Sequence, residues 1–306
     1  MKKTELLAPA GSMKTLKAAV KAGADAVYLG AGKFSARANA ANFHGDELIT
    51  AIDYAKAADV KVYLAINTLM TDRELKEAMT IVEQAYNAGI AAFILQDLGL
   101  AYMVMQKYPD AVLHASTQMT AQTLKDVTTL GSLGFKRVVM ARELSRVQIK
   151  EVAQNTTVEL EIFIHGALCS SYSGQCLMSS FLGGRSANRG NCAQPCRLPY
   201  KGRVGKGVLL SLKDLCLIDH VGDLAEIGVK SLKIEGRMKG EDYVCAVVGA
   251  YRQALDGKIL SSKEKKAMLC VFDRGGYTDG YYSDNKYGMY MDSLRNPYRK
   301  GAQHAD

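Results

Sequence analysis

Long apolar runs, an export signal and tryptophan are all missing from the 306-residue sequence. No stretch approaches the roughly 18 uninterrupted apolar residues that a membrane-spanning helix requires. Pro9 and Gly11 cut the N-terminal apolar run short, which excludes the core of a secretory signal. The absence of tryptophan leaves phenylalanine and tyrosine as the large aromatic side chains. These absences predict a cytoplasmic protein that has no contact with a membrane.

The composition excludes disorder and small disulfide-bonded scaffolds. With 48% hydrophobic and 23% charged residues, the chain can bury roughly three quarters of its unfolded surface in a large core. Its seven cysteines are odd in number and expected in a reducing compartment, so thiols in metal or redox chemistry are favoured over disulfides. The net charge of +8 suits a polyanionic partner such as RNA. A merely solvated basic surface is the alternative, since no charged block exceeds residues 263–266.

One unit recurs along the chain: an amphipathic stretch, a glycine, and a short run rich in Val, Ile, Leu or Tyr. Each glycine suits the left-handed residue that follows a helix. The apolar runs are typical of strands buried on both faces. Eight strands are predicted, at residues 5–8, 26–30, 61–66, 92–95, 112–115, 137–140, 158–164 and 231–235. Eight successive units predict an α/β fold, a (β/α)8 TIM-type barrel, with a doubly wound open sheet as the rival.

One connection is too long for this rhythm. Roughly 65 residues separate the seventh and eighth predicted strands, and only residues 215–227, with Asp214 as a cap, look helical. The excess, residues 165–207, is a cysteine-rich insertion after strand 7, on the face where barrel active sites lie. We predict a barrel domain over residues 1–258, which includes the insertion, and a C-terminal helical segment and tail over residues 259–306.

The insertion carries four cysteines, with six, fifteen and three residues between them: Cys169, Cys176, Cys192 and Cys196. Four thiolates in one loop can hold a tetrahedral Zn²⁺ or an iron–sulfur cluster. Only the last two approach the spacing of a zinc site, so the pattern favours the larger cluster. Four unrelated buried cysteines are the alternative interpretation. Three other cysteines look like core residues on helices: Cys216, Cys245 and Cys270.

Residues 161–169 read Glu-Ile-Phe-Ile-His-Gly-Ala-Leu-Cys, and Gly174, Cys176, Met178 and Ser179 follow. This segment resembles the hallmark of the collagenase-like peptidase family U32. The resemblance extends over nearly the whole chain, through residues 6–12, 25–30, 213–216 and 233–239. It implies a barrel-type N-terminal domain, in agreement with the periodicity.

The resemblance also implies a chemistry. Several members of the family hold a 4Fe-4S cluster with four cysteines, here Cys169, Cys176, Cys192 and Cys196. They hydroxylate, without oxygen, uridine in tRNA, cytidine in ribosomal RNA or the ubiquinone ring, and the tRNA branch draws on prephenate. We therefore expect tRNA or rRNA and a small organic acid such as prephenate as partners, with tRNA uridine becoming 5-hydroxyuridine. Some short members work with a partner, so a cluster-bearing subunit of a hetero-oligomeric hydroxylase is an alternative.

A U32-type peptidase is the other alternative. Neither Gly-x-Ser-x-Gly nor His-Glu-x-x-His occurs, which leaves no recognisable serine or zinc protease motif. A cysteine protease needs a thiolate beside a histidine, and Cys169 lies four residues after His165. If all four cysteines bind a cluster, none is free to attack a peptide.

Polar residues near the carboxyl ends of the predicted strands are the candidate site residues. We predict catalytic roles for Glu235, Arg237, His165 and His114, and substrate binding by Arg142, Arg37, Asn67 and Gln96. Arg142 and Arg237 suit the carboxylates of a small acid, with ion pairs to Glu143 or Glu235 as the alternative, and Arg37 suits a phosphate. For the histidines, the alternative is a structural role. In the loop after strand 2, Phe34 or Phe43 either stacks on a base or anchors the loop.

Overall fold

A computed structural model of the chain describes residues 4–32, 34–37, 41–202 and 205–291. Its centre is a closed ring of eight parallel strands: β1 (Glu5–Pro9), β2 (Ala26–Gly30), β3 (Lys61–Ile66), β4 (Ala92–Leu95), β5 (Leu113–Ala115), β6 (Arg137–Val139), β7 (Glu159–Gly166) and β11 (Ser231–Ile234). Each strand pairs with the next, and β11 closes the ring between β7 and β1. The predicted TIM-type barrel is confirmed, with strand ends shifted by at most two residues.

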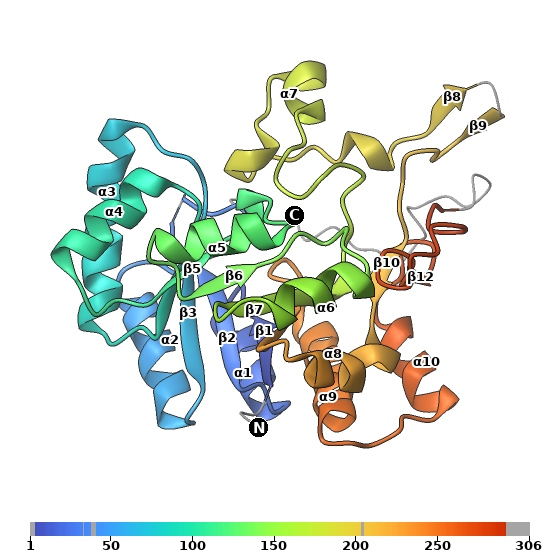
Figure 1. The fold of residues 1–306 in the computed structure, drawn as a ribbon, viewed down its shortest axis with the longest axis horizontal. Helices are drawn as coiled ribbons and strands as arrows, with labels where there is room; N and C mark the ends of the chain where they lie inside the picture. Colours follow the sequence, from blue (N-terminus) through green and yellow to red (C-terminus); the bar gives the residue numbers. More distant parts are fainter. Residues whose placement is uncertain (1–3, 33, 38–40, 203–204, 292–306) are drawn as a thin grey trace.

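Helices cover the outside of the barrel (Figure 1). They are α1 (Met13–Lys21), α2 (Asp46–Ala57), α3 (Asp72–Asn87), α4 (Leu98–Lys107), α5 (Leu124–Ser132), α6 (Arg146–Gln154), α8 (Val221–Ile227) and α9 (Glu241–Leu255), while α10 (Ser262–Cys270) packs on α9. Ser12, Thr71 and Ser145 cap their helices by accepting a backbone hydrogen bond. Gly23 and Gly228 follow α1 and α8 with φ of +89° and +100°, which explains the recurring glycine. Among the described residues, no helix has the length and apolar character needed to cross a membrane.

Between β7 and β11 the chain leaves the ring and builds the insertion, which projects from one end of the barrel (Figure 1). It contains α7 (Met178–Gly183) and an antiparallel hairpin of β8 (Tyr200–Gly202) and β9 (Gly205–Gly207). The chain then returns along the barrel as β10 (Asp214–Cys216), antiparallel to the end of β7, and β12 (Tyr277–Thr278) pairs with β10.

The predicted helix at 215–227 is wrong in its first half. β6 pairs with β7 only as far as Glu161, which leaves the backbone of the last residues of β7 open on that side, and β10 fills this edge. Asp214 is buried and pairs with Arg274 (Oδ1 to Nη2, 3.0 Å) instead of capping a helix. Of the three cysteines expected in the core on helices, Cys216 lies on β10 instead. Cys245 and Cys270 lie on helices, α9 and α10, but are exposed and not in the core.

The interior of the barrel has an apolar side and a charged side. Leu7, Tyr28, Tyr63 and Ile94 belong to a buried apolar cluster between the strands. Facing it, four charged side chains form a chain of contacts: Glu5 Oε1 to Arg137 Nη1 (2.6 Å), Arg137 Nη1 to Glu161 Oε2 (3.4 Å), and Glu161 Oε1 to Lys233 Nζ (2.7 Å). These four residues are the buried ionic group. Burial lowers the pKa of Lys233, and Glu161 opposes that shift.

We expect Glu161→Gln to lower the free energy of unfolding by about 3 to 5 kcal/mol, because Lys233 and Arg137 lose a buried counter-charge. The matched control is Glu83→Gln, which breaks an exposed pair with Lys107 and is expected to cost less than about 1 kcal/mol. Urea denaturation of both variants at neutral pH measures the difference. Equal losses would contradict a structural role for the buried ionic group.

Candidate active site at the mouth of the barrel

Charged and amide side chains converge where the carboxyl ends of the strands meet the insertion. Arg37 lies in the loop after β2, Asn67 directly after β3, Arg142 after β6, and Glu235 directly after β11. Parallel strands bring these loops to one end of the barrel. Four of the predicted site residues therefore lie around one mouth.

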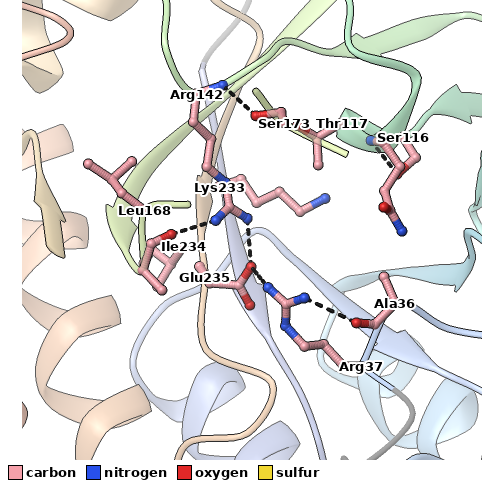
Figure 2. Close-up of polar contacts among 12 residues, drawn as sticks. Ala36, Arg37, Ser116, Thr117, Arg142, Leu168, Ser173, Lys233, Ile234 and Glu235 are labelled. Atoms are coloured by element: carbon pink, nitrogen blue, oxygen red, sulfur yellow. Dashed lines mark hydrogen bonds and ion pairs between the residues drawn. The ribbon is translucent and has the colours of Figure 1, made fainter. Parts of the chain in front are cut away.

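Glu235 is the centre of an ion-pair cluster with Arg37 and Arg142 (Figure 2). Its Oε2 accepts hydrogen bonds from Arg37 Nη2 (2.8 Å) and Arg142 Nη2 (2.6 Å). Burial alone would raise the pKa of Glu235, but the two guanidinium groups outweigh it and hold the pKa well below its ordinary value. The carboxylate is therefore ionised at neutral pH. This environment favours positioning of the arginines over the predicted catalytic role.

Arg142 also connects the mouth to the insertion. Its Nη1 donates to the carbonyl of Ala167 (2.5 Å), and its backbone N–H donates to Ser173 Oγ (3.1 Å). The guanidinium carbon lies 3.8 Å from the centre of the Phe163 ring. Arg142 therefore pairs with Glu235, one of the two carboxylates considered as its ion-pair partner. The other, Glu143, accepts hydrogen bonds from Ser173.

Arg237 is buried beside these groups without a counter-charge of its own. It is 5% exposed, and its Nη1 has no hydrogen-bond partner among the described residues. Asn42 Oδ1 is likewise buried and unpartnered within the described chain. Both atoms lie against Gly30, because a Cβ there would be 2.3 Å from Arg237 Nη1 and 2.5 Å from Asn42 Oδ1. The pair fits a small ligand that offers an anionic acceptor and a donor together.

Burial lowers the pKa of Arg237 to about 10, so the guanidinium is still protonated at neutral pH. The loop after β11 therefore presents an unpaired buried cation two residues beyond an ionised carboxylate. An anion that reaches Arg237 would gain a charge-assisted hydrogen bond in a site of low dielectric constant.

Asn67 joins neighbouring loops. Its Oδ1 accepts from the Ala36 N–H (3.0 Å), and its Nδ2 donates to Ser116 Oγ (3.0 Å). Gln118 Nε2 donates to the carbonyl of Asn67 (3.0 Å) and to that of Asn188 in the insertion (3.2 Å). These amides hold the loops after β2, β3 and β5 to the insertion, and substrate binding by Asn67 stays a prediction.

Gln96 and the phenylalanines of the β2 loop are buried in the protein. Gln96 Nε2 donates to the carbonyl of Gln118 (3.3 Å), while its Oε1 has no partner in the described chain, so substrate binding by Gln96 also stays a prediction. Phe34 and Phe43 are 2% and 0% exposed. The hypothesis that either ring stacks on a base is wrong, because both side chains anchor the loop in the core.

The two histidines do not face the mouth. His114 lies inside the barrel against Tyr63, with ring centres 4.8 Å apart, and burial holds its pKa well below the ordinary value. His165 Nδ1 is 3.3 Å from Tyr251 Oη on α9, and burial lowers its pKa to about 3. Both are neutral and packed, which favours the structural alternative. Among the described residues, Cys169 and His165 form no hydrogen bond, so a cysteine protease pair is not assembled.

Four free thiols of the insertion share one electrostatic environment: Cys169, Cys176, Cys192 and Cys196. Burial raises the pKa of Cys176, and charge on the other three thiols adds to the shift. Cys192 is exposed and the others are half-buried. These observations favour one shared site over four unrelated buried cysteines.

Hydrogen-bond donors surround these sulfurs. The backbone of Met178 donates to Cys176, and that of Gln194 donates to Cys192 Sγ (3.3 Å). Ser179 Oγ lies 3.9 Å from Cys192 Sγ. Glu235 is the main cause that raises the pKa of Arg37, and Cys192 adds to the same shift.

Four free thiols with N–H and O–H donors near their sulfurs are a donor set that suits an iron–sulfur cluster. No three His, Cys, Asp or Glu side chains within the described ranges are grouped tightly enough to hold one metal ion. A bound cluster at these cysteines stays a prediction.

Two residues of the mouth were not among the predicted site residues: Asn42 and Lys239. Burial lowers the pKa of Lys239 to about 7, and the nearby Arg274 adds to the shift, so this amine can exchange a proton near neutral pH. Lys239 lies in the segment 233–239 that carries the family resemblance, which was the available signal. Asn42 gives no comparable signal, because only the fold brings it to Arg237.

Comparisons with known proteins agree on a family. The family model of peptidase family U32 matches residues 11–292. The 23S rRNA 5-hydroxycytidine C2501 synthase of Escherichia coli is 42% identical over 83% of this chain and 40% of its own length. The tRNA hydroxylation protein P1 of Bacillus subtilis is 37% identical over 83% of this chain and 64% of its own. The chain thus spans less than two thirds of either relative.

A solved structure, that of the U32 peptidase Mk0906, resembles the chain in fold. It superposes with a TM-score of 0.53 over 76% of this chain and 93% of its own, at 14% sequence identity.

The ion-pair cluster makes stability depend on pH. The pKa of Glu235 in the folded state lies below the value of about 4.3 expected when unfolded, so its ionised form stabilises the fold above that pH, and the contribution is lost as pH falls toward the folded pKa. We expect Glu235→Gln to lower the free energy of unfolding at neutral pH. The deficit relative to wild type should shrink by about pH 3. Urea denaturation across this range measures it, and a deficit independent of pH would argue against the ionised carboxylate.

Replacing Arg237 and replacing Arg142 by methionine should have different effects on the free energy of unfolding. Arg237→Met removes an unpaired buried cation, so we expect an unchanged or higher free energy of unfolding. Arg142→Met leaves Glu235 with one fewer partner and should cost about 3 kcal/mol. Thermal and urea denaturation of both variants without added ligand provide the comparison. A larger loss for Arg237→Met than for Arg142→Met would mean that Arg237 is a structural residue.

Proposed function

Because the chain belongs to peptidase family U32, we propose that it is an iron–sulfur-dependent enzyme that hydroxylates a pyrimidine in RNA without molecular oxygen. The names of the relatives, a 5-hydroxycytidine synthase and a tRNA hydroxylation protein, support the reaction class. The specific form that we propose is conversion of tRNA uridine to 5-hydroxyuridine with prephenate as co-substrate. The observation that carries the proposal is a set of four free thiols in the insertion, which Arg142 and Gln118 bind to the arginine-lined mouth of the barrel.

The residues that would hold a 4Fe-4S cluster are Cys169, Cys176, Cys192 and Cys196. When bound, such a cluster supplies electron transfer or binds an oxygen donor. The chain itself contributes the thiolates and the donors on their sulfurs from Met178, Ser179 and Gln194, which tune the ligands. Zinc is the less favoured occupant, because only Cys192 and Cys196 approach the spacing of a structural zinc site.

The arginines of the mouth would bind the small acid. Arg237 is protonated, buried and unpaired, and Asn42 Oδ1 beside it can accept a hydrogen bond from a hydroxyl. Prephenate offers carboxylates and a hydroxyl group, which match this pair. Glu235 keeps Arg37 and Arg142 in place beside it.

The peptidase alternative has less support than the hydroxylase. A cysteine protease would require a Cys169–His165 pair, whereas His165 contacts Tyr243 and Tyr251. Assembly with a related subunit stays a prediction that the size of the purified protein in solution would test.

The cysteines provide the direct test. After anaerobic purification, we expect wild type to contain iron and acid-labile sulfide in equal amounts, and Cys176→Ala to lose both. In a strain from which the gene for this protein is deleted, the wild-type protein should restore the hydroxylated pyrimidine nucleoside, and Cys176→Ala should not. Mass spectrometry of digested RNA measures the nucleoside.

The matched control is Cys245→Ala, an exposed cysteine on α9, which should keep both the metal and the modification. A hydroxylated nucleoside that persists in Cys176→Ala, or zinc in place of iron in wild type, would overturn the proposed function.

A further inference from the structure

The insertion carries charge of one sign. Residues 165–207 contain six Lys and Arg residues and no Asp or Glu, so this segment supplies most of the net charge of +8. Two of the six have structural partners: Arg197 is buried and donates to Leu168, and Arg189 pairs with Glu74 on α3. Three others are exposed and form no ion pair with any residue that the structure describes: Arg185, Lys201 and Lys206. The sixth, Arg203, lies outside the described residues.

The β8–β9 hairpin places two of these cations face to face. Lys201 and Lys206 are directly opposite each other in the register, and the hairpin forms a separate two-stranded sheet. Like charges at directly opposite positions destabilise a strand pair, and a two-stranded hairpin is marginal by itself. An anionic ligand that lies across the hairpin would convert this repulsion into attraction.

The α7 helix presents apolar side chains to solvent next to the thiols. Phe181 is 86% exposed and Leu182 is 65% exposed. Ser179 of the same helix is buried and accepts a hydrogen bond from the Ala193 N–H (3.1 Å), beside Cys192. One side of α7 is thus fastened to the cysteine loop, and its other side offers an aromatic ring that packs on nothing in the core.

Resting on the proposed function, we infer that two exposed parts of the insertion bind the single-stranded RNA segment that flanks the target nucleotide: α7 and its C-terminal turn, with Phe181, Leu182 and Arg185, and the β8–β9 hairpin, with Lys201 and Lys206. Cations that follow phosphates and an exposed ring on which a base stacks are the combination used for single strands. A duplex would hide its bases from Phe181. Because α7 is bonded to the cysteine loop, a strand held here brings the neighbouring nucleotide to the mouth.

The experiment is fluorescence anisotropy with a labelled single-stranded oligouridylate and the full chain, purified anaerobically. Phe181→Ala should weaken binding about tenfold, the scale of one base–aromatic stack. The double variant Lys201→Gln/Lys206→Gln should weaken binding and reduce the slope of log Kd against log salt by about two. The side chains of Phe181, Lys201 and Lys206 are exposed, so these variants should keep the iron content and melting temperature of wild type.

The controls carry the same chemical changes elsewhere. Tyr102→Ala removes an exposed ring from α4, and Lys21→Gln/Lys136→Gln neutralises two exposed lysines at the other end of the barrel. Both should bind like wild type. The inference is overturned if wild type does not bind the oligonucleotide, if a duplex of equal length binds more tightly, or if the insertion variants bind as tightly as the controls.

These outcomes are separable from failure of the proposed function. Unchanged RNA binding by the insertion variants, with the hydroxylated nucleoside still formed in cells by wild type, would overturn only the RNA-binding surface. Weakened binding by the variants, with no nucleoside that depends on wild type, would overturn only the hydroxylase.

Discussion

The carboxylate of Glu235 holds together parts of the chain that are far apart in sequence. It binds Arg37 from the loop after β2 and Arg142 from the loop after β6, and Arg142 in turn binds Ala167 at the start of the insertion. Without this anion, two largely buried cations would face each other. One carboxylate among Arg37, Arg142 and Arg237 still leaves the mouth electropositive. The geometry of the mouth and its excess of positive charge thus have the same origin.

The barrel below the mouth supports this arrangement. Lys233 on β11 lies two residues before Glu235, and its Nζ is 4.3 Å from the centre of the Tyr28 ring. Tyr28 Oη in turn donates a hydrogen bond to the carbonyl of Ile234 (2.9 Å). The buried ionic group therefore fixes β11 from below while the arginines fix its end from above. A rigid strand end of this kind is what a positively charged site needs if its cations are not to move apart.

The periodicity of the chain was sufficient to predict the eight strands and the helices between them, because each unit is local in sequence. The failures depend on distant partners. Asp214 has the chemistry of a helix cap, but Arg274 lies 60 residues away. Strand alternation from Glu161 and Phe163 would point His165 into the barrel. A register shift between Lys233 and Ile234 pairs His165 with Ile234, and His165 packs against α9 instead. The cysteine spacing was visible in sequence, whereas the approach of Asn42 to Arg237 was not.

Closure of the barrel does not use the insertion, because β7 and β11 pair directly with each other on either side of it. In polymer terms the insertion, residues 165–207, is an extra length of loop on a ring that is already closed. Doubling the length of such a loop costs only about 0.6 kcal/mol in closure entropy. Relatives that share one barrel can therefore differ in the length of this insertion at little cost to the folding of the ring.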